Sequence, residues 1–150
     1  LSPILSFTAE EAWRYQAAPQ APSVFLWDLP APAARWTDAA LAARWEKVLA
    51  VRTVVQKALE EARAAKVIGA SLQARVVLTG SRETLAPLKG LDLPEVLIVS
   101  EASLDETGAD LTVAVFQAAG AKCPRCWRWQ SDIGSNPSQP ELCGRCARQL

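Results

Sequence analysis

Four cysteines near the C-terminal end are the residues of this sequence whose types and spacing are best suited to chemistry. They form two Cys-x-x-Cys pairs, Cys123 with Cys126 and Cys143 with Cys146, with sixteen residues between the pairs. No other cysteine occurs in the 150-residue chain, and it contains no histidine. Such pairs have two common uses inside cells, metal binding and thiol redox chemistry.

The spacing of the two pairs favours metal binding. A redox site needs one Cys-x-x-Cys pair at the head of a helix in a βαβ unit, whereas two pairs about 15–20 residues apart are typical of structural zinc. Two facing turns place four sulfurs about 2.3 Å from one Zn²⁺ and leave no open coordination position. We therefore predict one structural Zn²⁺ per chain, with disulfide bonds or redox chemistry as the alternative.

Basic and aromatic side chains gather around the cysteine pairs. Residues 122–150 carry five Lys and Arg against two acidic residues, whereas residues 1–121 carry eleven against fourteen. These cations can offset the negative charge of four thiolates around Zn²⁺. Arginine beside exposed indoles is also a pattern that binds unpaired nucleotides, and we expect one indole to be exposed and the other packed. The candidate RNA-binding residues are Lys122, Arg125, Trp127, Arg128 and Trp129.

A helical part comes first in the sequence. Thr8 and Glu11 form a capping box that predicts a helix from about Ala9 to Ala17. Prolines in the stretch SVFLWDLPAPAAR then predict an extended connector. From about Asp38 to Ala65, side chains spaced three and four apart predict a long amphipathic helix with one face in a core. That face comprises Leu41, Trp45, Val48, Arg52, Val55, Leu59 and Ala62.

The composition then changes to that of a small domain with three strands. β-branched runs predict strands at residues 71–79, 95–100 and 111–116, and residues 82–88 are expected to form a short helix. Together with the turn-rich interval between the cysteine pairs, this gives an α+β fold class. We expect a helical segment, a three-stranded α+β domain and a four-cysteine zinc ribbon or knuckle.

Composition limits the class of protein further. The chain is half hydrophobic with zero formal net charge, so it can bury a core. No apolar run is long enough to span a membrane and no signal peptide is recognisable, so we expect a cytoplasmic protein. Because it opens with Leu1-Ser2-Pro3 and contains no methionine, we expect it to be a fragment of a longer protein.

Four stretches of the sequence resemble the C-terminal part of bacterial isoleucyl-tRNA synthetases. They are PILSFTAEEAW, SVFLWDLP, VRTVVQKALEEARAAKVIGASLQARVVL and KCPRCWRW…LCGRC. They follow the order of that family across nearly the whole chain. The last two together distinguish the isoleucine enzymes from the related valine and leucine enzymes.

The resemblance implies three domains and a nucleic-acid partner. Residues 1–69 would end a helical anticodon-binding domain, residues 70–120 would form an α+β junction domain, and residues 121–150 a zinc-binding module. The parent enzyme would activate isoleucine with ATP and charge tRNA(Ile). This fragment would bind tRNA(Ile) as a monomer and catalyse nothing, because the two ATP-handling signatures of the family are absent from it. ATP and isoleucine would bind only to the missing catalytic domain.

Two other classes of function remain open on the sequence. Formamidopyrimidine-type DNA glycosylases end in a similar four-cysteine zinc finger that binds duplex DNA, although the upstream stretches argue against that class. A zinc-stabilised protein-interaction module is the other alternative, and it would have no affinity for tRNA.

Overall fold

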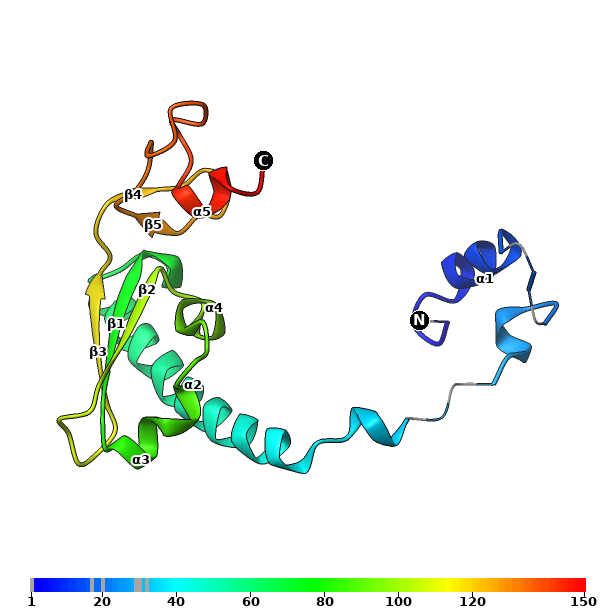
Figure 1. Cartoon of the computed structure of the whole chain (residues 1–150), viewed down its shortest axis with the longest axis horizontal. Helices are drawn as coiled ribbons and strands as arrows, with labels where there is room; N and C mark the ends of the chain where they lie inside the picture. The colour runs from blue at the N-terminus through cyan, green and yellow to red at the C-terminus, as the bar shows by residue number, and fades with distance from the viewer. Residues whose placement is uncertain (1, 17, 20, 29–30, 32) are drawn as a thin grey trace. The chain divides into compact units, whose positions relative to one another are not determined.

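The computed structural model describes residues 2–16, 18–19, 21–28, 31 and 33–150, and the chain divides into two compact units, Leu1–Asp38 and Ala39–Leu150. Figure 1 traces both units from the blue N-terminus to the red C-terminus. The predicted domain boundaries after residues 69 and 120 stay predictions. No helix among the described residues combines the length and hydropathy that crossing a membrane requires.

The first unit contains helix α1, Ser6–Arg14, and two 3-10 turns, Val24–Leu26 and Ala34–Trp36. The predicted start at Ala9 is wrong, because the N-cap is Leu5 and no side chain caps the helix. Thr8 therefore lies inside the first turn, where it cannot form the predicted capping box. The predicted end at Ala17 lies outside the described residues.

Polar contacts join α1 to the segment that follows it, which was predicted to be extended. The Glu10 carboxylate accepts hydrogen bonds from Ser23 Oγ at 2.8 Å and from the Val24 N–H at 3.1 Å. The Trp13 indole N–H donates to the Ala21 carbonyl at 2.8 Å. The hydrogen bond from Ser23 lowers the pKa of Glu10. The contact is therefore at full strength above the ordinary pKa of a glutamate, and it weakens as the pH falls through the lowered pKa.

The long helix is confirmed as α2, Ala39–Ala64, the first element of the second unit. Its buried residues are Val48, Val51, Val55 and Leu59. Leu41 and Trp45 belong to the predicted buried face but are exposed in the first two turns. Arg52 lies at the edge of that face, where its Nε donates to the Val96 carbonyl at 3.0 Å. The helix therefore buries only its middle and C-terminal turns.

A three-stranded mixed sheet packs against α2. It consists of β1, Ala74–Thr79, β2, Glu101–Asp105, and β3, Thr112–Gln117, in the order β2-β1-β3. β1 pairs parallel with β2 and antiparallel with β3. Alternate residues of β1 are buried, so one face of the sheet joins α2 in the core while the other is partly exposed. α2 and the sheet thus form two layers (Figure 1). This confirms the predicted α+β fold class, although the prediction assigned the long helix to a separate helical segment.

The strand predicted at residues 95–100 is wrong. Helix α4, Leu93–Leu97, occupies most of it, and β2 begins only at Glu101. The Asp92 side chain accepts from the Glu95 N–H at 3.2 Å, and Pro94 lies in the first turn of the helix. Both residues are signals of a helix start. They decide the conformation here, because the apolar run is too short for its hydrophobic periodicity to distinguish a helix from a strand. The short helix predicted at 82–88 is confirmed as α3, Arg82–Leu85, followed by the 3-10 turn Ala86–Leu88.

The C-terminal module, residues 121–150, contains the hairpin of β4, Ala121–Lys122, with β5, Trp129–Gln130, and the short helix α5, Gly144–Ala147. Gly120 leads into it with φ of +87°. A Cβ at this position would lie 2.2 Å from the Gln130 carbonyl oxygen, so only glycine fits against the hairpin.

Ser100, which directly precedes β2, joins this module to the sheet domain. It is the buried polar residue among those that the structure describes, with 4% of its surface exposed. Its hydroxyl donates to the Leu72 carbonyl and accepts from the Trp129 N–H, at 2.6 Å in the latter case. Its own N–H donates to the Ala74 carbonyl at 3.1 Å. One side chain therefore satisfies backbone groups of both the domain and the module.

Replacement of Ser100 by alanine is expected to lower the free energy of unfolding by about 1–3 kcal/mol, because it leaves the Trp129 N–H and the Leu72 carbonyl without a partner. Urea denaturation followed by circular dichroism measures the change. The matched control is Ser103→Ala at an exposed position of β2, which should alter stability little. Equal stability of the two variants would show that the hydroxyl does not hold the module.

Candidate metal centre

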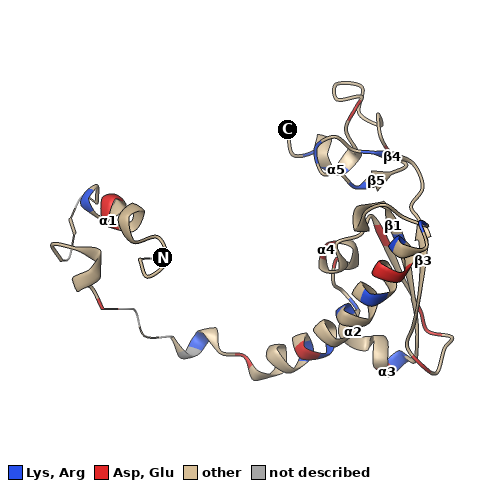
Figure 2. Ribbon diagram, turned by 180° about the vertical axis from the view of Figure 1, so that it is seen from behind, with Lys and Arg blue, Asp and Glu red and all other residues tan. Residues whose placement is uncertain are grey.

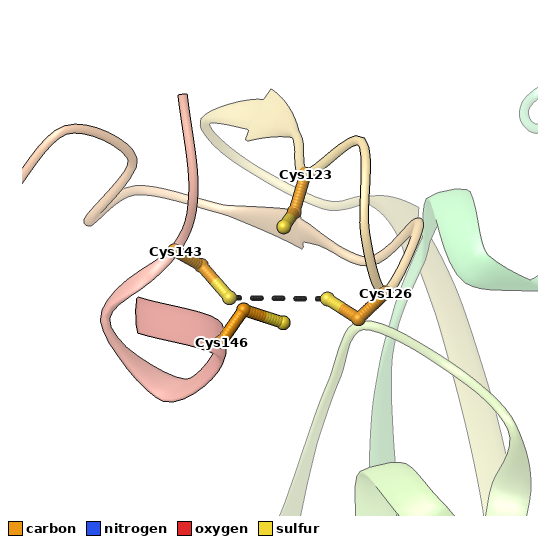
Figure 3. Close-up of side chains that lie close together, drawn as sticks. All are labelled: Cys123, Cys126, Cys143 and Cys146. Atoms are coloured by element: carbon orange, nitrogen blue, oxygen red, sulfur yellow. Dashed lines mark hydrogen bonds between the residues drawn. The ribbon is translucent and has the colours of Figure 1, made fainter. Parts of the chain in front are cut away.

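The C-terminal module brings its four cysteine side chains to one point (Figure 3). Cys123 follows β4, Cys126 ends the first turn, and Cys143 and Cys146 flank the start of α5. Their sulfur atoms all lie within 4.8 Å of one another. Three of the four residues are buried, and Cys126 is half-buried. The two pairs, sixteen residues apart in sequence, thus form one cluster.

Backbone hydrogen bonds shape the two turns that carry the sulfurs. In the first turn, the Trp127 N–H donates to the Cys123 carbonyl and the Cys123 N–H donates to the Arg128 carbonyl, both at 2.9 Å. In the second, the Ala147 N–H donates to the Cys143 carbonyl at 2.9 Å. Asp132 ties the intervening loop to the second turn by accepting from the Gly144 N–H at 3.0 Å.

The donor set and its spacing fit zinc. Tetrahedral coordination with Zn–S bonds of about 2.3 Å places sulfurs about 3.8 Å apart. Cys126 Sγ and Cys143 Sγ are separated by 3.8 Å. All four cysteines are free, and that separation is far longer than a disulfide bond. The cluster therefore fits one closed tetrathiolate site.

The electrostatics of the cluster also call for a cation. Burial opposes ionisation of Cys123, but hydrogen bonds from the backbone of Cys143, Cys126 and Arg125 outweigh it and lower the pKa of Cys123 to about 6. Burial raises the pKa of Cys126, and burial together with the neighbouring thiols raises that of Cys146 to about 12. The Cys123 thiolate forms readily, whereas those of Cys126 and Cys146 form with difficulty, so a metal ion is needed to stabilise a fully ionised cluster.

The predicted RNA-binding residues lie on different sides of the module. Trp127 is the exposed indole, with 60% of its surface accessible, and Lys122 Nζ lies 5.6 Å from its ring centroid. Trp129 is half-buried beside Ser100. Arg125 donates to the Cys146 carbonyl at 2.9 Å and so links the first turn to the second. The Arg128 side chain is only 14% exposed and lies 4.0 Å from Glu95.

A cavity of about 440 Å³ opens beside the cysteine cluster. It is lined by Leu72, Arg125, Cys126, Arg128, Arg145, Cys146 and Gln149. Figure 2 shows the blue basic segments of the module on and around β4, β5 and α5. Arg145 was not among the predicted RNA-binding residues. The signal that could have found it is its position, because Arg145 in Cys-Gly-Arg-Cys corresponds to Arg125 in Cys-Pro-Arg-Cys.

Two families of known proteins match this chain. The family described as "Anticodon-binding domain of tRNA ligase" matches residues 1–78, and the family described as "Zinc finger found in FPG and IleRS" matches residues 120–149. The second match, with the clustered cysteines, establishes a structural zinc as the cofactor. The DNA glycosylase alternative is not better supported, because the match over residues 1–78 is to tRNA ligases.

Curated relatives confirm the resemblance to isoleucyl-tRNA synthetases. Isoleucine–tRNA ligase of Bordetella petrii is 42% identical over 100% of this chain and 17% of its own length. That of Exiguobacterium sibiricum is 40% identical over 97% of the chain and 17% of its own length. Isoleucine–tRNA ligase 2 of Burkholderia mallei is 46% identical over 100% of the chain and 16% of its own length. The chain thus spans about a sixth of these relatives, and it belongs to the family of anticodon-binding domains of tRNA ligases.

Proposed function

We propose that this chain is the tRNA-recognition part of an isoleucine–tRNA ligase and binds the anticodon region of tRNA(Ile). One observation carries the proposal: the match to tRNA ligase anticodon-binding domains over residues 1–78 occurs in the same chain as the four-cysteine cluster. The parent enzyme would activate isoleucine with ATP and charge the tRNA, acting as a monomer in the cytoplasm. The chain itself would position tRNA without catalysing a reaction.

The three predicted domains stay part of this proposal. Residues 1–69 would end the helical anticodon-binding domain, residues 70–120 would be the junction domain, and residues 121–150 the zinc-binding module. Cys123, Cys126, Cys143 and Cys146 would be the four zinc ligands. In this arrangement the metal holds the two turns rigid, and the side chains that project from them make the contacts to RNA.

Trp127 is the side chain that we expect to stack on an unpaired base. Its φ of +64° is uncommon for a bulky residue, and such strain persists where the surroundings impose it, often at functional sites. The hydrogen bond from its N–H to the Cys123 carbonyl fixes this conformation and leaves the ring exposed. A groove of about 370 Å³ runs beside the indole, and Lys122 stands over the ring, where it could meet a phosphate. Base stacking on an exposed aromatic ring needs these features.

The remaining predicted residues would act in other ways. The Trp129 N–H donates to Ser100, and Arg125 donates to the Cys146 carbonyl. These contacts favour a role for both residues in positioning the module. Arg128 is turned away from solvent toward Glu95, so any contact with RNA would occur inside the cavity.

Removal of zinc is expected to unfold the C-terminal module and to leave the sheet domain folded, because the core around α2 does not include the cysteines. Apparent binding free energies of such sites are about 10–16 kcal/mol near neutral pH. Elemental analysis should find one zinc per chain, and Cys146→Ser should lose it, whereas the control Ser138→Ala in the exposed loop should retain it. Less than half an equivalent of zinc under reducing conditions would contradict the assignment.

The choice of partner is tested by filter binding of the zinc-loaded chain to two probes. We expect it to retain an isoleucine tRNA transcript more tightly than a duplex DNA of equal phosphate content, because single-stranded loops offer bases for stacking and duplexes do not. Tighter retention of the duplex would favour the glycosylase class. Retention of neither probe would favour a protein-interaction module.

The stacking role of Trp127 is tested by a variant that should lower the affinity for tRNA without lowering the stability of the module. Trp127→Gly relieves the positive φ, so the stability of the module should be unchanged or raised by up to about 1 kcal/mol. The affinity for the tRNA should nevertheless fall by about 1–3 kcal/mol. Trp127→Phe should recover part of the loss, and zinc content and thermal unfolding are measured on the same proteins. Undiminished affinity of Trp127→Gly would remove the stacking role.

A further inference from the structure

We propose that the cavity beside the cysteine cluster binds one phosphate group of the RNA backbone between Arg128 and Arg145, and that Glu95 is an internal competitor displaced by that phosphate. This inference rests on the proposed tRNA-binding function and adds a second, separate contact to it. The stacking groove at Trp127 and this cavity share only Leu72 among their lining residues.

The two guanidinium groups share one carboxylate as their charged neighbour. Arg128 NH2 lies 4.0 Å, and Arg145 NH1 3.7 Å, from the same Glu95 oxygen, Oε2. Both distances exceed those of a hydrogen bond. Across the part of the chain that the structure describes, no oxygen accepts a hydrogen bond from either group. Each guanidinium carries five N–H donors in a planar fork, so a phosphate with several acceptor oxygens would satisfy what one distant carboxylate oxygen does not.

Arg125 lines the same cavity but has a different task. Its NH1 donates to the Cys146 carbonyl at 2.9 Å, which binds the two cysteine turns together. Arg128 is held in place by burial, with 14% of its side chain exposed, whereas Arg145 is 51% exposed at the mouth. The cavity therefore offers one fixed and one accessible guanidinium. That pairing suits an anion that enters from solvent.

Glu95 is placed to compete with an incoming phosphate rather than to stabilise the fold. Its side chain is 68% exposed, and exposed pairs at such distances add little stability. The start of α4 does not depend on that side chain, because it is the Asp92 carboxylate that caps the Glu95 N–H. The carboxylate can thus turn to solvent when a stronger acceptor arrives.

Neutralisation of the zinc thiolates is the alternative role for these arginines. Cys126 and Cys146 line the cavity, so positive charge nearby would favour their thiolate forms. Charge compensation acts over distance, however, and leaves the N–H donors without acceptors. If compensation were the main role, loss of Arg145 would loosen the metal rather than weaken RNA binding alone.

The experiment measures affinity for the isoleucine tRNA transcript, its dependence on salt, zinc content and thermal stability on one set of variants of the zinc-loaded chain. Arg145→Gln should bind about three- to tenfold more weakly, and the salt slope of log K should fall by about 0.7–0.9. Glu95→Gln should bind about two- to fivefold more tightly, because the arginines lose their competitor. In the Arg145→Gln background, most of that gain should disappear.

Matched controls separate the cavity from general electrostatics. Arg148→Gln removes a positive charge from α5's end without lining the cavity, and Glu141→Gln removes a negative charge from the module's exposed loop. Arg148→Gln should lower the affinity for tRNA less than Arg145→Gln does, and Glu141→Gln should raise it less than Glu95→Gln does. Equal effects of Glu141→Gln and Glu95→Gln, or zinc loss in Arg145→Gln, would overturn the inference.

The same series distinguishes this inference from the proposed function. If Trp127→Gly weakens tRNA binding while the variants at Glu95 and Arg145 leave it unchanged, the cavity does not bind phosphate but the tRNA-recognition function stands. If the unaltered chain does not bind the tRNA, both are overturned. If the variants at Glu95 and Arg145 shift affinity as expected, the cavity is a phosphate site.

Discussion

Four cysteine sulfur atoms gathered in one largely buried cluster favour a cation among them, and the C-terminal module is arranged around that cluster. The thirty residues of this module contain few large apolar side chains. Its hydrophobic cluster consists of the cysteines, with Ile133 and Leu142 packed beside them. So small a core would not order the segment without metal. Once the two cysteine turns are closed on zinc, their backbone geometry determines where Trp127, Arg125 and Arg145 project.

Ser100 fixes the orientation of this module relative to the sheet of the second unit. A metal alone would fix the two turns relative to each other but would leave the module free to swing on Gly120. The Ser100 hydroxyl removes that freedom because it bonds both Leu72 and Trp129. The position of the exposed indole is therefore defined relative to the sheet, which is what the proposed stacking on RNA would require.

The parts that could be predicted from the sequence are those whose signals are local and redundant. The periodicity of α2 extends over seven turns, and the cysteine spacing is specific to one kind of metal site. The segment 95–100 could not be assigned from its apolar residues alone, because a run of that length suits a strand and a buried helix equally well. The decisive residues, Asp92 and Pro94, lie just before it.

Residues that act through tertiary contacts had no such signal. Ser100 looks like any serine at the end of an apolar run until the fold brings Leu72 and Trp129 beside it. Arg125 and Arg145, at matching positions of the two cysteine turns, make different contacts for the same reason. Arg125 donates to a carbonyl of the other turn, whereas Arg145 faces the more distant carboxylate of Glu95 in α4.

The two partners of the Ser100 hydroxyl have a consequence for the order of folding. They lie 28 residues before it and 29 residues after it in the chain. Closure of each cysteine turn involves residues only three apart, so metal capture by a pair is a local and fast event. Docking through Ser100 instead requires the sheet to be assembled first, and non-local contacts of this kind form slowly. Joining the two pairs on one metal spans 17 residues, from Cys126 to Cys143, which is still shorter than the 28 and 29 residues that docking through Ser100 spans. The module should therefore acquire its shape before it acquires its orientation.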